Sequence, residues 1–389
     1  MHTDRRRFFQ AAATTAVSAS RILGANDRIR LGAIGVGGRG TYDLGLAAKA
    51  DNTQIVAVCD VYEPRLAEVK QRLAPHGAAY ADYRELLDRN DIDAVIIASP
   101  DHWHAPMIID SIQAGKDVYC EKPVCHSIAE GQRLLAEAAA SKQIVQIGYQ
   151  QRSWEHFKEA QQMIASGKLG RVALIVSHWY QGYRKLMSNR KPADPAKIDW
   201  NRFLGDAPKQ PFDPIRCAYW RWFWDFGGGH LTDLFSHWVD VIHWCMGEDT
   251  PRSAQTTGAR NVFPEFECPD TISAAYEYPG GFCVIYNGSL VGSLEAGGIV
   301  FHGSEALMRL NRSGFAYWEE GAAAFEKPDL PPPKASARAT ADGTIAHMQN
   351  FLDCVRTRAA PNAPLASSVA AARAAHIGNL AYRERTARS

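Results

Sequence analysis

The sequence predicts an α/β protein with two domains: a doubly wound parallel sheet, then an α+β domain with a large open, mostly antiparallel sheet. Two observations predict this fold class. Up to Gly148, continuous apolar runs alternate with helical segments, which is typical of a parallel sheet that helices cover on both faces. After Gly148, apolar and polar residues alternate within each run, which indicates strands that bury only one face.

The first domain is expected to span residues 27–149. Its strands are predicted at residues 29–34, 54–59, 94–98, 117–120 and 144–147. Its helices are predicted near residues 41–49, 64–73, 83–88, 104–114 and 127–140. Because the carboxyl ends of parallel strands share one edge of the sheet, we expect a ligand crevice beyond that edge.

The second domain is expected to span residues 150–389. After a helix at 154–165, strands are predicted at residues 172–179, 253–262, 271–278, 282–288 and 306–310. Three consecutive prolines make residues 330–334 a rigid loop, and helices at 344–356 and 367–384 follow. Since one face of an open sheet stays uncovered, we expect a homo-oligomer.

Composition limits the class of partner. The chain has 43 Lys and Arg against 42 Asp and Glu, which excludes a basic surface for nucleic acid and favours a small neutral ligand. No apolar run reaches the roughly 18 residues that a membrane-spanning helix needs. The eight cysteines form no C-x-x-C pair, so we expect no disulfide framework and no zinc ribbon.

A glycine cluster directly follows the first predicted strand. Gly35, Gly37 and Gly40 have G-x-G-x-x-G spacing, and Gly38 and Arg39 complete the turn into a helix. Glycine lets the backbone approach a pyrophosphate closely, and the helix N-terminus presents unpaired N–H groups to it. The pattern predicts a dinucleotide site. The alternative is a glycine-rich turn in another kind of α/β domain.

Asp60 indicates which dinucleotide binds. It ends the second predicted strand, where a carboxylate accepts the ribose hydroxyls of NAD and repels the 2′-phosphate of NADP. We therefore expect NAD to be favoured over NADP.

The tripeptide Glu121-Lys122-Pro123 follows the fourth predicted strand. Pro123 biases Lys122 toward an extended conformation, which presents its ammonium at the crevice. A lysine there can hydrogen-bond a substrate hydroxyl or take its proton. The alternative is a solvated lysine in a surface turn.

A stripe of histidines and aspartates follows three glycines at 227–229. His230, Asp233, His237 and Asp240 share one helix face that carries no Lys, Arg or Glu, which indicates a cleft rather than solvent. Asp233 and His237 are four residues apart, so the carboxylate can raise the basicity of the imidazole. Two alternatives remain open: buried hydrogen bonds, or a divalent metal held by the first three side chains.

Two further segments are candidates for ligand contacts. Ser99 and Pro100 follow the third predicted strand, with Trp103 packed near the nicotinamide and His104 at the start of the next helix. His104 can equally begin that helix without any chemical role. The aromatic run at 219–224 can stack on sugar rings or form core.

Residues 1–26 are expected to lie outside the fold as an export signal. Three arginines at 5–7 precede a stretch of small residues at 11–20, which resembles the bacterial twin-arginine signal. This route moves folded proteins, so an exported nucleotide enzyme would have to hold NAD tightly. We expect a periplasmic protein, or a cytoplasmic one if the signal does not function.

Together, the glycine cluster, the Glu-Lys-Pro tripeptide and the pattern G-G-G-x-x-x-D-x-x-x-H resemble the Gfo/Idh/MocA oxidoreductase family, from about Ile29 to the C-terminal helix. That family includes glucose–fructose oxidoreductase and inositol dehydrogenase. The resemblance implies an NAD-dependent enzyme in which Lys122, Asp233 and His237 line the site where a sugar or cyclic polyol hydroxyl is oxidised.

The expected reaction transfers a hydride from a secondary alcohol to nicotinamide. We expect His237 to take the hydroxyl proton, Lys122 to hydrogen-bond the same oxygen and Asp233 to orient the imidazole, with either Lys122 or His237 as formal base. Cofactor contacts are assigned to Gly35, Gly37, Gly38, Arg39, Gly40, Asp60, Ser99, Pro100, His104, Glu121 and Lys122. Substrate contacts are assigned to Trp103, Arg152, Tyr180, Trp222 and His230.

Two other functions fit the sequence. Some members of the family resemble redox-neutral glycosidases, which oxidise a ring hydroxyl, eliminate, hydrate and return the hydride to the sugar. The second alternative is a metal-dependent hydrolase or isomerase.

Overall fold

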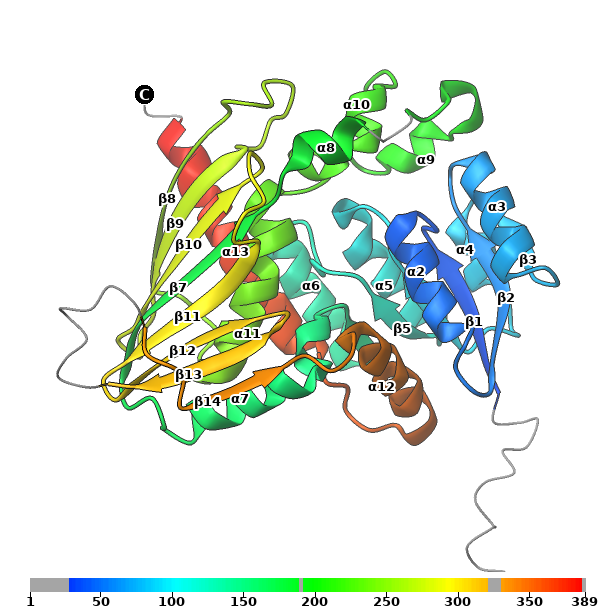
Figure 1. Ribbon diagram of the computed structural model, residues 1–389. Helices are drawn as coiled ribbons and strands as arrows, with labels where there is room; N and C mark the ends of the chain where they lie inside the picture. The colour runs from blue at the N-terminus through cyan, green and yellow to red at the C-terminus, as the bar shows by residue number, and fades with distance from the viewer. Residues whose placement is uncertain (1–27, 189–191, 321–329, 387–389) are drawn as a thin grey trace, which may run out of the picture.

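The computed structural model describes residues 28–188, 192–320 and 330–386, which form two sheets with helices packed against them (Figure 1). One sheet is parallel and the other mostly antiparallel, which confirms the predicted fold class. The predicted export signal at 1–26 lies outside the described residues. None of the described helices combines the length and the apolar character that crossing a bilayer requires.

The first sheet has six parallel strands in the order β3-β2-β1-β4-β5-β6. Their bounds are β1 (Ile29–Ile34), β2 (Thr53–Cys59), β3 (Ala78–Tyr80), β4 (Ala94–Ile97), β5 (Asp117–Cys120) and β6 (Val145–Ile147). The strands β1, β4 and β5 are buried along nearly their whole length, as their continuous apolar runs require. The strand order reverses between β1 and β4, which opens the ligand crevice at that point.

Helices cover both faces of this sheet (Figure 1). They are α2 (Gly38–Ala47), α3 (Glu63–Leu73), α4 (Tyr83–Leu87), α5 (His104–Gln113) and α6 (Ile128–Ala139). The helix predicted at 41–49 begins earlier, at Gly38, so the glycine turn and the helix N-terminus coincide. Ser127 caps α6, because its hydroxyl accepts a hydrogen bond from the N–H of Glu130 at 3.1 Å.

The second sheet has eight strands in the order β14-β13-β12-β11-β7-β10-β9-β8. They are β7 (Val172–Tyr180), β8 (Ser253–Ala259), β9 (Thr271–Glu277), β10 (Cys283–Ser289), β11 (Gly297–Gly303), β12 (Ala306–Asn311), β13 (Gly314–Glu319) and β14 (Ala335–Arg338). The pair β7 and β10 is parallel, and the other pairs are antiparallel. Three of these strands, β11, β13 and β14, were not predicted.

One face of the second sheet is covered by α7 (Glu155–Ala165), α11 (Ser236–Met246) and α13 (Leu365–Thr386), which lie on the same side of it in Figure 1. Alternate residues point into this layer: Ile175 of β7 is fully buried, whereas its neighbour Leu174 is 37% exposed on the other face. The sheet therefore has the open face that its sequence pattern predicts.

The helix α12 (Gly343–Thr357) returns to the first domain after the second sheet is complete. Met348, Phe351 and Leu352 are buried in the same apolar cluster as Leu31 of β1 and Tyr119 of β5. The rings of Tyr119 and Phe351 lie 5.7 Å apart, edge to face. A segment from near the end of the sequence thus completes the core of the first domain.

Residues 192–226, which we name the lobe, lie between β7 and α11 in the sequence and extend over the first domain (Figure 1). The lobe contains α9 (Trp200–Leu204) and α10 (Pro214–Ala218), and α8 (Tyr183–Ser188) precedes it. The N–H of Asp199 donates to the carbonyl of Val61 at 2.9 Å, and Ile198 forms a β-bridge with Tyr62. These backbone contacts fix the lobe over the carboxyl edge of β2.

Candidate functional site

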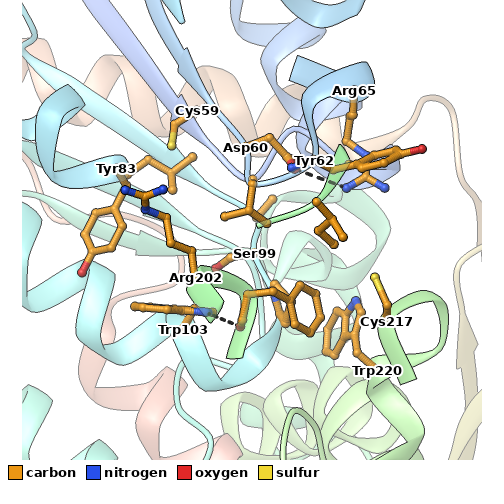
Figure 2. Close-up of a pocket in the computed structure, with 18 of the residues that line it drawn as sticks. Cys59, Asp60, Tyr62, Arg65, Tyr83, Ser99, Trp103, Arg202, Cys217 and Trp220 are labelled. Carbon is orange, nitrogen blue, oxygen red and sulfur yellow. Dashed lines mark hydrogen bonds and ion pairs between the residues drawn. The ribbon is translucent and has the colours of Figure 1, made fainter. Parts of the chain in front are cut away.

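Two cavities adjoin at the carboxyl edge of the first sheet. The first, of about 390 Å³, lies between the glycine turn and the lobe (Figure 2). The second, of about 680 Å³, lies between the first domain and α11. The two cavities share five of their lining residues: Arg39, Ala98, Ser99, Trp220 and Arg221. A ligand that fills the first cavity can therefore reach into the second.

The glycine turn fits a pyrophosphate. A Cβ on Gly35, whose φ is +79°, would lie 2.8 Å from the backbone of Ala98, and one on Gly40 would lie 2.0 Å from the carbonyl oxygen of Gly35. Around Gly38, in contrast, the position of a Cβ has no neighbour within 4 Å. No side chain caps α2 at Gly37, so the first N–H groups of the helix remain available to phosphate oxygens.

Asp60 lines the first cavity at the end of β2 (Figure 2). Its carboxylate accepts hydrogen bonds from the N–H groups of Val36 and Tyr62, both at 2.9 Å, and lies 3.5 Å from a guanidinium nitrogen of Arg65. These contacts fix the carboxylate beside the glycine turn, and its remaining lone pairs can accept ribose hydroxyls. The position matches the one expected for an NAD-selecting acid.

Arg39 and Glu121, both predicted to contact the cofactor, pair with each other at 3.0 Å. Glu121 also accepts a hydrogen bond from the amide nitrogen of Gln150 at 2.7 Å. Burial alone would raise the pKa of Glu121, but Arg39 and Lys122 outweigh it, so that pKa is lowered. Glu121 thus holds two neighbouring elements in place at the cavity wall.

The residues of the loop after β4 that were predicted to contact a ligand do not all line the same cavity. Ser99, Pro100 and Trp103 line the first cavity, and Trp103 donates from Nε1 to the carbonyl of Phe203 in the lobe at 2.9 Å (Figure 2). His104 lines the second, with Nδ1 2.6 Å from the carbonyl oxygen of Pro123 and Nε2 2.9 Å from that of Ser99. The structure therefore places Trp103 at the nucleotide cavity rather than among the substrate contacts assigned to it.

Lys122, Asp233 and Arg221 form an ion-pair cluster in the second cavity. Lys122 Nζ lies 2.7 Å from Asp233 Oδ1 and donates to the carbonyl oxygen of Asp233 at 2.5 Å. Arg221 Nε lies 3.1 Å from the same carboxylate oxygen. Burial alone would raise the pKa of Asp233, but the two cations lower it to about 2. Asp233 is therefore ionised and orients Lys122.

His237 lies in the same cavity but is not oriented by Asp233, contrary to the prediction. Residues Leu231–Phe235 form a π-helical turn, whose wider spacing breaks the α-helical register between the two side chains. The ring of His237 instead stacks on Trp179, with centroids 5.6 Å apart and planes 22° apart. Burial, with the charges of Lys122 and Arg312, lowers the pKa of His237 well below its ordinary value.

The Nδ1 atom of His237 is buried and has no hydrogen-bond partner among the described residues. Buried polar atoms are normally paired, and unpaired ones often mark a binding site. Because its pKa is lowered well below the ordinary value, the imidazole of His237 is neutral.

Two other members of the predicted stripe are interior residues. His230 Nε2 lies 3.2 Å from the carbonyl oxygen of Asp270, and burial lowers its pKa to about 4. Asp240 accepts a hydrogen bond from Arg152 Nε, which lies 3.0 and 2.8 Å from its two carboxylate oxygens in a buried pair. Neither His230 nor Arg152, both expected to contact the substrate, lines either cavity, because each satisfies a buried polar partner.

The two remaining residues assigned to the substrate also lie elsewhere. Trp222 is fully buried and stacks on Phe266, with centroids 5.8 Å apart, so this part of the aromatic run is core. Tyr180, at the end of β7, lines neither cavity. In the described part of the chain, no three His, Cys, Asp or Glu side chains are placed to hold a metal ion.

Several residues of the second cavity were missed from the sequence: Gln151, Trp154, Trp179, Arg221 and Arg312. Arg221 could have been predicted from the sequence, because it is a charged residue within the aromatic run that precedes the glycines. For Arg312, in the turn between β12 and β13, the sequence carries no signal.

Comparisons with known proteins identify both domains. Residues 29–149 match the model of an oxidoreductase family with an NAD-binding Rossmann fold, and residues 157–309 match the GFO/IDH/MocA C-terminal domain.

Two curated relatives cover parts of the chain. Myo-inositol 2-dehydrogenase of Thermotoga maritima is 28% identical over 221 residues, which is 57% of this chain and 56% of that protein. Glycosyl hydrolase family 109 protein 1 of a Shewanella species is 35% identical over 118 residues, 28% of this chain and 26% of that protein. The chain spans about half the length of the first of these relatives.

The fold is also found in solved structures. Scyllo-inositol dehydrogenase from Lactobacillus casei, with bound NAD(H) and scyllo-inositol, has a TM-score of 0.67 at 19% identity, covering 92% of this chain and 98% of that one. Two models of one family match successive parts of the chain, and the glycine turn fits a dinucleotide. The chain therefore belongs to the Gfo/Idh/MocA oxidoreductase family, with an NAD-binding Rossmann domain followed by that family's C-terminal domain.

Proposed function

We propose that the protein is an NAD-dependent dehydrogenase that oxidises a secondary hydroxyl of a sugar or cyclic polyol. One observation carries the proposal: Lys122 from the first domain and His237 from the second line one cavity, which adjoins the nucleotide crevice. The similarity to a myo-inositol 2-dehydrogenase supports a hydroxylated ring as substrate.

The proposed mechanism divides the chemistry between two side chains. When bound, NAD would supply the hydride acceptor at its nicotinamide ring. His237, neutral because its pKa is lowered, takes the proton of the substrate hydroxyl as general base. Lys122, held by Asp233, donates a hydrogen bond to the same oxygen and stabilises the negative charge that develops there.

A substrate panel tests this function. We expect purified protein with NAD to form NADH, detected by its absorbance, with at least one member of a panel of inositols, hexoses and hexose acids. Mass spectrometry of the nucleotide released on denaturation should show NAD. A protein that binds no pyridine nucleotide would contradict the proposal.

We further propose that NAD is held tightly. The lobe covers the first cavity and is joined to the first domain by backbone contacts and by Trp103. Tight binding also suits export of the folded enzyme to the periplasm by the proposed twin-arginine signal. Cell fractionation of the native chain and of a variant with the three arginines at 5–7 changed to lysine tests the export.

The open face of the second sheet supports a homo-oligomer. It presents a mixed surface with partly exposed apolar side chains such as Leu174 and Ile285. Covering such a face with a second copy would bury apolar area and protect the sheet.

A redox-neutral glycoside hydrolase is the second candidate function. The similarity of part of the chain to a glycosyl hydrolase of family 109 favours it, and a retained cofactor suits a cycle that returns its hydride. Release of free sugar from an aryl glycoside without net NADH would select this function over the dehydrogenase.

A further inference from the structure

One cation of the second cavity makes no ion pair with a described residue. Arg312 lines this cavity from the turn between β12 and β13. No hydrogen bond or ion pair joins its guanidinium to any described residue; its contact is with the ring of Trp179, whose centroid lies 4.9 Å from Cζ. The other cations of the cavity are paired: Arg39, Lys122 and Arg221 each contact a carboxylate.

Unpaired polar atoms lie on the same wall. The side-chain amide of Gln151 and the Nε1 of Trp154 are buried in this wall and have no hydrogen-bond partner among the described residues. His156 links this segment to the turn that carries Arg312, because its Nε2 lies 2.9 Å from the carbonyl oxygen of Asn311. The guanidinium of Arg312 and the side-chain amide of Gln151 therefore lie in the same wall without a partner in the described part of the chain, whereas the indole N–H of Trp154 packs against Gly343.

The charge of Arg312 favours an anion. Burial of the guanidinium and the positive charge of Arg39 lower the pKa of Arg312 to about 10, so the group is protonated at neutral pH, while part of the side chain remains exposed to solvent. A negatively charged ligand group would supply the missing partner, and a planar guanidinium pairs best with a carboxylate or phosphate. The carboxylates of Glu121 and Asp342 lie close enough to act on Arg312, and they would repel a second negative charge. A monoanion fits this balance better than a phosphate dianion.

We propose that the substrate carries a carboxylate, which Arg312 binds in the second cavity beside the unpaired side-chain amide of Gln151. This inference rests on the proposed dehydrogenase for the chemistry at His237 and Lys122, and it narrows the substrate to a sugar acid. The near-zero net charge of the chain favoured a neutral ligand, but the local charge of the cavity decides which ligand group binds there.

Binding measurements test the proposal without relying on turnover. Calorimetric titration of NADH-loaded protein would compare D-glucuronate and D-galacturonate with D-glucose and D-galactose. We expect at least one acid to bind roughly 10- to 100-fold more tightly than its neutral partner, as a charge-assisted pair gives. Arg312→Gln should abolish that preference and leave the neutral sugars within about twofold. Arg309→Gln, an exposed arginine of the same hairpin, is the matched control and should change neither.

The outcomes separate the possible roles of Arg312. Acids that bind no better than their neutral partners would overturn the proposal. An Arg312→Gln variant that weakens acids and neutral sugars equally would also overturn it, because it would mean that Arg312 only supports Trp179. Equal or tighter Arg312-dependent binding of glucose 6-phosphate would assign the site to phosphate and reject the carboxylate.

Activity then distinguishes this inference from the proposed function. Acid binding that depends on Arg312, without NADH formation from any acid, would keep the carboxylate site and reject the dehydrogenase. NADH formation with equal kcat/KM for acids and neutral sugars would keep the dehydrogenase and reject the carboxylate site.

Discussion

A single aspartate pairs with two cations of the second cavity. Asp233 pairs with Lys122 and Arg221, and its pKa of about 2 keeps it ionised at any ordinary assay pH. This pairing supports the proposal that Lys122 acts as a hydrogen-bond donor and His237 as the group that accepts the proton. The roles proposed for the two side chains rest on charge pairing rather than on their spacing in the sequence.

Replacing either of these two side chains should abolish turnover and spare the cofactor. We expect Lys122→Ala and His237→Ala each to lower kcat roughly 100- to 10,000-fold, because each removes a group that acts on the reacting oxygen. NAD affinity, measured by fluorescence titration, should be unchanged. Lys158→Ala, a partly exposed lysine of α7, is the control. Activity retained in both variants would remove the mechanism.

The pH profile should reflect the lowered pKa of His237. Protonation of this base inactivates it, so activity is lost on the acid side, at the pH where the imidazole gains its proton. Because that pKa lies well below its ordinary value of about 6.5, kcat/KM should stay level between about pH 8 and pH 6. A profile that reaches half its maximum near pH 6.5 would show that His237 is not the base.

At the scale of elements, the π-helical turn Leu231–Phe235 explains why the predicted pairing of Asp233 with His237 does not occur. In a sequence, two residues four positions apart are predicted to be neighbours on an α-helix, because π-helical turns are too rare to be expected. The strands β1 and β5 match their predicted bounds, because both are continuous apolar runs. In contrast, β11 was not predicted, because it begins with two glycines, which do not favour a strand. Its pairing with β7 holds it in the sheet.

The lobe should control how fast NAD leaves. Gly205 has a φ of +56°, and a Cβ there would lie 2.5 Å from the ring of Trp103, which joins the lobe to the first domain. We expect Gly205→Ala to speed NADH dissociation roughly tenfold, which corresponds to about 1.4 kcal/mol. Stopped-flow displacement of NADH would measure the rate.

Gly115→Ala is the matched control for the lobe, because Gly115 also has a positive φ but no neighbour within 4 Å of a Cβ. It carries the same backbone strain without touching the lobe. Equal dissociation rates in the two variants would show that the lobe does not retain the cofactor.

At the scale of the whole molecule, the sequence located the nucleotide crevice but only part of the second cavity. The glycines and Asp60 lie in one continuous segment, so their spacing alone predicts where they meet. Trp179, Arg221 and Arg312 come from three distant segments, and only the packing of the two domains brings them together. His230 and Arg152 were predicted to contact the substrate, but both are buried away from the cavities. His230 lies beside the carbonyl of Asp270, and Arg152 forms an ion pair with Asp240.

Assembly through the open sheet face is testable by a change of charge. We expect Leu174→Glu to lower the mass measured by light scattering after size exclusion, because a carboxylate on this face would be costly to bury between two copies. Ile345→Glu, exposed on α12, should leave the mass unchanged. A monomeric native chain would contradict the expected homo-oligomer.

The return of α12 makes the nucleotide-binding unit discontinuous along the polypeptide. If residues 27–149 were expressed alone, the apolar cluster that includes Leu31 and Tyr119 would lose Phe351 and Leu352, and the ring of Tyr119 would lose its contact with Phe351. Such a fragment would tend to self-associate through this bare apolar patch. Exchange of nucleotide-binding units between relatives would therefore succeed only if the late helix is transplanted with them.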